Sequence, residues 1–194
     1  STLPVWSESY QLDLIEWHLH THAKVSRDTS FAGGAHWLLR DTASPQRCAN
    51  PAPVRCVNAK GVITRDGQLK DSYHLFRSYY TPCSAGKVCH VESPTWAVRH
   101  GFHGDEFIRV YSNCNSVHLT LDGINLGERL RSETSFPAAG LVWTVNFVAS
   151  SHVLNASCSC DADGTVVVSA IRQKWVVKPM KPTRSRKLRS ESDA

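Results

Sequence analysis

The spacing of hydrophobic residues changes near Pro82, and this change constrains the fold of the 194-residue chain more than any other feature. Before Pro82 the apolar side chains recur every three or four residues, which is the period of an α-helix. After Pro82 they alternate with polar side chains in short runs, which is the period of a β-strand. We therefore place a boundary between two differently built parts at about residues 81–85.

The first part predicts two helices around a short apolar segment. Ser7 is a suitable N-cap for a helix that reaches about His22. Residues 31–39 are apolar and hold two glycines, as a buried strand does where another backbone passes close. A proline-rich loop follows, and a second helix is expected over residues 69–80. Helix, buried strand, loop and helix in this order predict the end of a (β/α)8 barrel in residues 1–82.

The short alternating runs of the second part predict an immunoglobulin-like antiparallel β-sandwich over residues 83–178. The dipeptides Asp122-Gly123 and Asp163-Gly164 favour hairpin turns between strands. The expected strands are 87–92, 106–112, 116–121, 141–149, 165–171 and 174–177. The predicted fold class is therefore an α+β fragment, in which the last strand–helix units of a barrel precede a sandwich.

The net charge of +5 is concentrated at one end of the chain. From Lys178 onward there are six basic and two acidic residues, whereas the body before it holds 16 basic and 15 acidic ones. A nearly neutral body predicts no nucleic-acid partner, and residues 179–194 are expected to form a basic, disordered tail. No apolar run reaches the roughly 18 residues that a membrane helix needs, so no membrane partner is expected.

Seven cysteines are many for a chain of this size, and their number is odd. Cys158-Ser159-Cys160 has the wrong spacing for a zinc knuckle, and no pair of histidines at ligand spacing complements it. We therefore expect no metal and no cofactor. Buried free thiols at most positions, with one disulfide, are the simplest expectation. The cysteines leave the cellular compartment open.

Four segments, in order along the chain, resemble family 2 glycoside hydrolases of the β-galactosidase type. Trp6-Ser-Glu-Ser-Tyr-Gln11 is similar to the start of the helix that follows the nucleophile strand, and Gly33-Gly34-Ala35-His36-Trp37 to the eighth barrel strand. Asn58-Ala59-Lys60-Gly61, leading into Thr64-Arg65-Asp66, resembles an N-x-K-G motif with its following turn. Residues 110–123 resemble a hairpin of the family's sandwich, although His118 and Thr120 stand where that hairpin usually has Glu and Phe.

The resemblance implies three substrate-binding residues. Trp37 would form a wall of the subsite for the terminal sugar, and Asn58 would contact this sugar. Asn58-x-Lys60 is also a feature of β-glucuronidases, where the pair grips the sugar carboxylate, but many β-galactosidase-like members carry it as well. The structural alternatives are a Trp37 buried between barrel and helices, and a solvated loop for Asn58 and Lys60.

Glu8 is the most tempting catalytic candidate, because Ser7-Glu8-Ser9-Tyr10 superficially resembles the family's nucleophile segment. Its position predicts instead the first turn of a helix, where the helix dipole favours a carboxylate. We therefore expect no catalytic residue in this chain. By analogy with the family, the nucleophile would lie roughly 15–25 residues before Ser1, and the acid/base glutamate further upstream.

The resemblance implies the C-terminal part of a retaining, exo-acting β-glycosidase that hydrolyses terminal β-linked sugars, with β-galactosidase as the preferred activity. Two alternatives stay open: a β-glucuronidase, and a non-catalytic carbohydrate-binding or structural β-sandwich fragment. The expected partners are a carbohydrate substrate and the missing N-terminal part of the enzyme. A homo-oligomer is compatible with the sequence.

Overall fold

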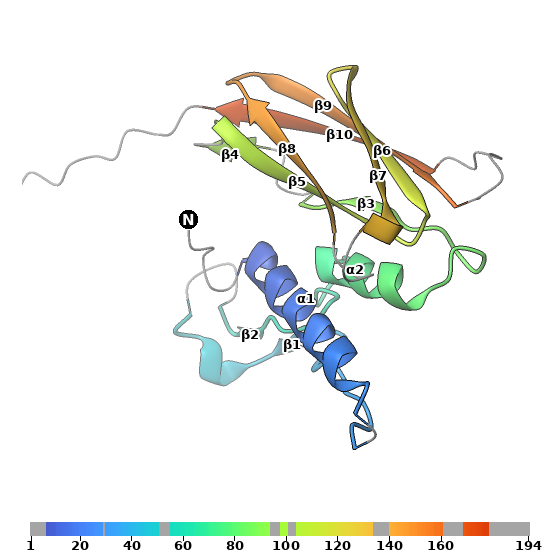
Figure 1. Cartoon of the computed structure of the whole chain (residues 1–194). Helices are drawn as coiled ribbons and strands as arrows, with labels where there is room; N and C mark the ends of the chain where they lie inside the picture. Colours follow the sequence, from blue (N-terminus) through green and yellow to red (C-terminus); the bar gives the residue numbers. More distant parts are fainter. Residues whose placement is uncertain are drawn as a thin grey trace, which may run out of the picture.

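The computed structural model describes residues 7–28, 30–50, 55–93, 98–100, 104–133, 140–160 and 169–178. They form two parts that lie one above the other (Figure 1). The helical part, residues 7–80, holds both α-helices, and the sandwich, residues 88–178, holds two sheets in which all but one of the strand pairs are antiparallel. The mostly antiparallel architecture agrees with the predicted sandwich, whereas a barrel is not formed by the described residues.

The first predicted helix is confirmed as α1, Glu8–Val25. The Ser7 hydroxyl accepts a hydrogen bond from the backbone N–H of Tyr10 at 3.1 Å, as an N-cap does. Leu12, Ile15 and Leu19 are buried along one face of the helix, at the spacing of three and four residues that the sequence shows.

The second predicted helix is confirmed as α2, Asp71–Tyr80, which packs against α1. It begins two residues later than expected because Lys70 has an extended backbone, with ψ of 166°. The two helices share a small core with neighbouring segments. This core contains Leu12, Ile15, Leu19, Val62, Leu75 and Tyr111.

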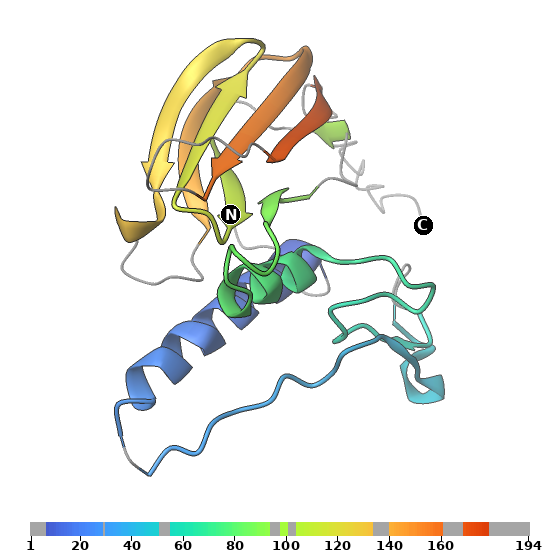
Figure 2. The same cartoon turned by 90° about the vertical axis from the view of Figure 1, so that its right-hand side faces the viewer.

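The prediction of a buried strand at residues 31–39 is wrong for this chain. The segment is irregular and largely exposed, with 74% of Trp37 and 67% of Leu39 accessible to solvent. Figure 2 shows it as a trace running beneath α1. A strand needs neighbours for its N–H and C=O groups, and in the described part of the chain residue 40 makes one isolated bridge, to Ile63.

Short elements fill the predicted loop between this segment and α2. β1, Thr42–Ala43, pairs antiparallel with β2, Val57–Asn58. A 3-10 turn, η1, covers Pro45–Arg47. The disulfide between Cys48 and Cys56 ties the turn to the strand that follows it.

The sandwich has one sheet of five strands and one of three. The larger sheet has the order β4-β10-β9-β6-β7, and the smaller the order β3-β5-β8. The strand bounds are β3 Cys89–Val91, β4 Val98–His100, β5 Gly104–Ser112, β6 Ser116–Leu121, β7 Ile124–Leu130, β8 Leu141–Phe147, β9 Ser151–Ser159 and β10 Ser169–Lys178, with a 3-10 turn η2 at Arg131–Glu133.

Alternation of buried and exposed side chains explains the core of the sandwich. In β8 every second residue is buried, so that Trp143 and Phe147 face inward. β6 and β9 show the same period, with Leu119 and Leu154 fully buried. Two sheets that each present one apolar face can cover each other, which is the arrangement found here.

The Asp122-Gly123 hairpin is confirmed between β6 and β7, where both residues have positive φ (53° and 81°). The predicted strands at 165–171 and 174–177 correspond to the single strand β10 from residue 169 onward. β4, β7 and β9 were not predicted. Asp163-Gly164 and the predicted tail at 179–194 lie outside the described residues.

The expectation of mostly unpaired cysteines is wrong. Besides Cys48–Cys56, a disulfide joins Cys89 of β3 to Cys158 of β9 and thereby links the two sheets. The remaining three cysteines lie together at one end of the sandwich. Sequence spacing could not reveal these pairs, because each partner lies on a different strand or loop.

The two parts are joined by a partly buried polar network at α1 and β5. Tyr111 of β5 is fully buried in the helical core. Arg109 donates hydrogen bonds to Glu16 and Asp13, both at 2.9 Å, and to the Tyr111 hydroxyl at 3.0 Å. The Gly140 N–H donates to the other oxygen of Glu16 at 2.9 Å. Burial raises the pKa of Glu16, and the Arg109 charge opposes this rise.

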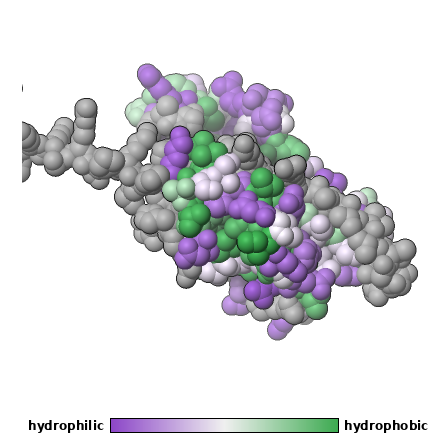
Figure 3. Space-filling view, turned by 90° about the horizontal axis from the view of Figure 1, so that it is seen from above, coloured by the Kyte–Doolittle hydropathy of each residue, from purple (hydrophilic) through white to green (hydrophobic). Residues whose placement is uncertain are grey.

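The surface of the sandwich is mixed. Figure 3, which views the molecule from above, shows hydrophobic residues in small groups among hydrophilic ones. Within the described residues, no helix has the length and hydrophobicity to cross a membrane.

Candidate functional site

A cavity of about 1100 Å³ lies in the helical part, between α1, residues 34–37 and the loop that follows β2. α1 contributes Tyr10, Leu14 and His18 to its wall, and the loop contributes Ala59 and Lys60. Aromatic and apolar side chains with a few polar groups among them are typical of a small-molecule site. This composition suits a ligand that has one apolar face and a polar edge.

Two of the three predicted site residues line this cavity. The exposed indole of Trp37 forms part of its wall, so the alternative of a Trp37 buried between packed elements does not describe this structure. Its peptide bond to Leu38 is cis. Lys60 is also exposed, and no carboxylate of the described residues is placed within ion-pair distance of its ammonium group.

The third predicted residue, Asn58, is not among the residues that line the cavity. It lies at the end of β2, partly buried, opposite Thr42. Its side-chain oxygen is buried and has no hydrogen-bond partner in the described part of the chain. A buried acceptor without a donor is costly, so Asn58 retains an unused capacity for a hydrogen bond.

The backbone of the Lys60 loop is held by side chains from α1 and from residue 36. The Gln11 amide donates to the carbonyls of Lys60 and Gly61, at 3.0 and 2.9 Å. His36 Nε2 lies 3.1 Å from the Lys60 carbonyl oxygen. Burial lowers the pKa of His36. These contacts orient the loop through its main chain and leave the Lys60 side chain available to the cavity.

A second anchor of the same loop is the buried ion pair of Asp41 and Lys70, whose charged atoms are 2.8 Å apart. Asp41 also accepts a hydrogen bond from the Gly61 N–H at 2.8 Å, and Lys70 donates to the Ala59 carbonyl at 3.1 Å. Removing one partner would leave the other charge buried without compensation, so the pair fixes the loop strongly.

Gly61 is required by close packing at this anchor. A Cβ at this position would lie 2.3 Å from the backbone nitrogen of Asp41 and 2.5 Å from the carbonyl carbon of Arg40. Both are main-chain atoms and cannot move aside as the end of a flexible side chain could. The glycine of the Asn58-Ala59-Lys60-Gly61 motif therefore allows the loop to approach the chain at residues 40–41.

Both carboxylates that line the cavity are already used in structural contacts. Glu8 occupies the first turn of α1, as predicted, and accepts a hydrogen bond from the Asp71 N–H at 2.5 Å, at the start of α2. Burial, and next the nearby Asp71 carboxylate, raise the pKa of Glu8. Asp41 is engaged by Lys70 and Gly61. Neither carboxylate is free to attack or protonate a ligand.

The sequence prediction missed the residues that position the loop. Gln11, Asp41 and Lys70 act on backbone atoms of residues 11 to 50 positions away, and such contacts have no periodic signature. His36 belongs to the Gly33-Gly34-Ala35-His36-Trp37 segment that carries the resemblance, but its contact with the Lys60 carbonyl depends on the fold of the loop.

A protein-family model described as "Domain of unknown function (DUF4982)" matches residues 107–150, which span parts of β5 to β8. A protein of Formosa agariphila named "Putative beta-glucuronidase" is 39% identical over 152 residues, which are 78% of this chain and 18% of that protein.

Solved structures that resemble this chain are also named as glycosidases. A β-glucuronidase of Parabacteroides merdae superposes with a TM-score of 0.77 and 33% identity, over 91% of this chain and 22% of that one. β-Glucuronidase 3 of Bacteroides uniformis superposes with a TM-score of 0.75 and 32% identity, over 91% of this chain and 21% of that one. A "putative beta-galactosidase" of Bacteroides fragilis, at 20% identity and a TM-score of 0.68, shares the fold.

These relatives are named as glycosidases. The chain is thus similar to a portion of β-glucuronidases and β-galactosidase-like glycoside hydrolases. It spans about a fifth of the length of the relatives that it matches.

Proposed function

We propose that the chain is the C-terminal part of a retaining, exo-acting β-glycosidase and that its substrate is a terminal β-glucuronide. Trp37 and Lys60 form part of the sugar-binding wall, and Asn58 supports it. The observation that carries the proposal is that Trp37 and Lys60 line one cavity, where the Lys60 ammonium has no carboxylate partner among the described residues.

The chemistry of a uronic acid fits this pair of side chains. A sugar ring has an apolar face that packs on an indole, and a glucuronide adds a carboxylate that pairs with an ammonium group. A galactoside carries no such anion. The sequence alone favoured a β-galactosidase; the unpaired Lys60 and the names of the relatives lead us to prefer the glucuronide.

The catalytic carboxylates belong to another part of the same protein in this proposal. A retaining glycosidase uses two carboxyl groups about 5–5.5 Å apart, one as acid/base and one as nucleophile. Glu8 and Asp41 are held in structural contacts and do not supply them. The remaining barrel strands would pair with residues 31–39 and cover the exposed side chains of the helical part.

The substrate is tested by Lys60→Met in the longer protein to which we assign this chain. We expect kcat/KM on a nitrophenyl β-glucuronide to fall at least about thirty-fold, because losing one partner of a desolvated ion pair costs about 2 kcal/mol or more. Activity on a nitrophenyl β-galactoside should change little. Lys24→Met is the matched control, since Lys24 is exposed and does not line the cavity. Equal effects on both substrates would point to the β-galactosidase alternative.

The isolated chain should hydrolyse neither substrate. This outcome separates a contribution to a larger active site from an activity of the chain itself. Turnover by the chain alone that disappears in Glu8→Gln would contradict both the proposal and the structural role of Glu8. Binding of sugars by the isolated chain without hydrolysis by the longer protein would favour the non-catalytic alternative.

A further inference from the structure

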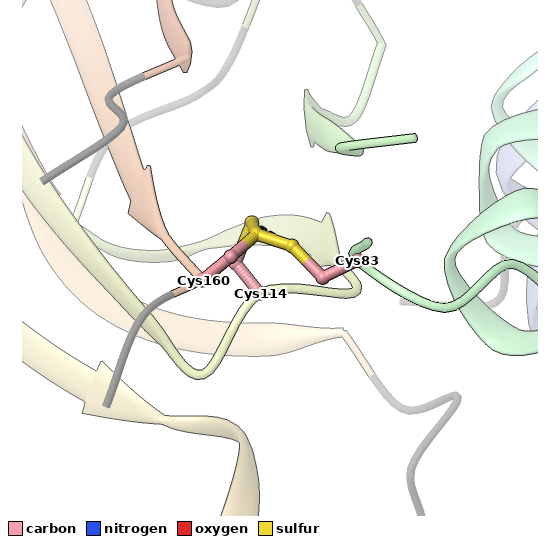
Figure 4. Close-up of side chains that lie close together, drawn as sticks. All are labelled: Cys83, Cys114 and Cys160. Carbon is pink, nitrogen blue, oxygen red and sulfur yellow. Dashed lines mark hydrogen bonds between the residues drawn. A yellow bond between two sulfur atoms is a disulfide. The ribbon is translucent and has the colours of Figure 1, made fainter. Parts of the chain in front are cut away.

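Three cysteines from three different segments bring their sulfur atoms together at one end of the sandwich (Figure 4). Cys83 follows α2, Cys114 lies in the turn between β5 and β6, and Cys160 directly follows β9. Their Sγ atoms all lie within 4.8 Å of one another. Such a cluster has more thiols than one disulfide can use.

Cys160 is the member that both others can reach. It lies in bonding contact with Cys83 and with Cys114, and the corresponding Cα–Cα distances are 6.1 and 4.2 Å. Disulfides usually span about 4.4–6.8 Å between Cα atoms, so both pairings are at or near the usual range. The Sγ atoms of Cys83 and Cys114 are 3.4 Å apart.

The cysteine count leaves one thiol over. Cys48 pairs with Cys56 and Cys89 with Cys158, which uses four of the seven cysteines. A sulfur atom forms one disulfide at a time, so the cluster can hold at most one disulfide, beside which one thiol remains. That thiol necessarily lies next to the bond that it can attack.

We propose that Cys83, Cys114 and Cys160 form a thiol–disulfide exchange site in which Cys160 pairs alternately with the other two. The Cys114 thiolate attacks Cys160 Sγ, the Cys83–Cys160 bond breaks, and Cys83 leaves as a thiolate that takes up the proton Cys114 released. The exchange is electron-neutral. The first disulfide forms by reaction with a small disulfide oxidant such as oxidised glutathione, which is reduced to two thiols.

The backbone around the cluster is held independently of the sulfur atoms. Asn113, which is buried, donates hydrogen bonds to the carbonyls of Thr81 and Gly86, at 2.9 and 2.7 Å. It also accepts one from the Val88 N–H at 2.8 Å. The segment that carries Cys83 thus stays on the sandwich after Cys83 leaves the disulfide, and the exchange requires movement of side chains rather than of the chain.

The two pairings differ in what they connect. Cys83–Cys160 ties the segment between α2 and β3 to the end of β9, and therefore adds a cross-link close to the helical part. Cys114–Cys160 closes a link within the sandwich alone. The exchange site would accordingly set whether a disulfide ties the segment between α2 and β3 to the end of β9.

Mapping of the disulfides in the native chain tests the proposal without any variant. The chain is equilibrated in a glutathione buffer, alkylated at low pH, digested and analysed by mass spectrometry. We expect one alkylated thiol per chain, divided between Cys83 and Cys114, and two cross-linked peptides that both contain Cys160. A single pairing under all buffer ratios would overturn the proposal, and so would a zinc ion whose removal exposes three reactive thiols.

Two variants sharpen the result. Cys114→Ser should trap Cys83–Cys160, Cys83→Ser should trap Cys114–Cys160, and each should lower the alkylated thiols from one per chain to none. Starting from a chain enriched in one pairing, wild type should return to its equilibrium ratio in the glutathione buffer, while Cys48–Cys56 serves as the unchanged reference pair. A ratio that does not relax would contradict exchange.

Discussion

The sandwich and the helical part contain similar side chains but bury them to very different extents. Every second residue of β8 is inside, and Trp143 is only 2% exposed. In the helical part, Trp17 and Trp37 are 61% and 74% exposed. Two sheets cover each other within this chain, whereas two helices and an unpaired segment leave apolar surface uncovered. The difference agrees with our proposal that further barrel strands cover the helical part.

The largest expected effect lies in the sandwich core. Trp143→Ala should lower the free energy of unfolding by about 3–5 kcal/mol, because it removes a buried indole and leaves a cavity. Trp17→Ala, the matched change in the helical part, should alter it by less than about 0.5 kcal/mol. Urea unfolding of the chain measures both. Equal losses would remove the contrast between the two parts.

Trp37 should matter for activity rather than for stability. In the longer protein, Trp37→Ala should lower kcat/KM about ten- to several-hundred-fold, since about 1.4 kcal/mol corresponds to a factor of ten. The same change should leave the stability of the chain alone nearly unaltered. Asn58→Ala is expected to lower kcat/KM to a similar extent, because it removes the buried side-chain oxygen that retains an unused capacity to accept a hydrogen bond. The proposed site is wrong if both variants stay within about twofold of wild type.

A smaller effect on stability is expected at the polar network that joins the two parts at α1 and β5. Glu16→Ala removes the acceptor of both Arg109 and the Gly140 N–H, and should cost about 1–3 kcal/mol. Asp13→Ala is the control, because Asp13 is more exposed and should contribute less than about 1 kcal/mol. Denaturant unfolding of both variants, followed by the loss of helical signal, tests this prediction. A larger loss of stability in Asp13→Ala than in Glu16→Ala would show that Asp13 is the more important partner of Arg109 at this contact.

The smallest effect is a dependence on pH. Burial, and next the charge of His90, lower the pKa of His74 to about 4, from 6.5. Between these values the unfolded chain binds the proton more strongly, so stability should fall as the pH falls from about 6.5 to 4. A single titrating proton limits the slope to about 1.4 kcal/mol per pH unit, and partial exposure lowers it further. His74→Gln should flatten it, and an unchanged slope would contradict the assignment of this dependence to His74.

Periodicity predicted most of the regular elements. The strand at 116–121 coincides with β6, and both helices lie where the apolar spacing placed them. β9 was missed because three of its four inward positions hold His152, Ala156 and Cys158, which give a weak hydrophobic signal. β7 was missed because few of its side chains are buried and Gly127 interrupts it.

The remaining features depend on distant partners. A strand pattern at residues 31–39 says nothing about whether neighbouring strands are present, and here they are not among the described residues. Trp37 and Lys60 could be singled out by resemblance. The anchors of their loop, Gln11 and the Asp41–Lys70 pair, act through main-chain atoms far away in sequence and needed the structure.

Hydrogen exchange over residues 31–39, compared with β9, tests most directly the claim that the helical part is completed by more of the same protein. In the isolated monomeric chain, amides of residues 31–39 should exchange rapidly while those of β9 are protected. In the longer protein both should be protected, because the segment would gain strand neighbours. Strong protection of residues 31–39 in a verified monomer of the 194-residue chain would contradict the account.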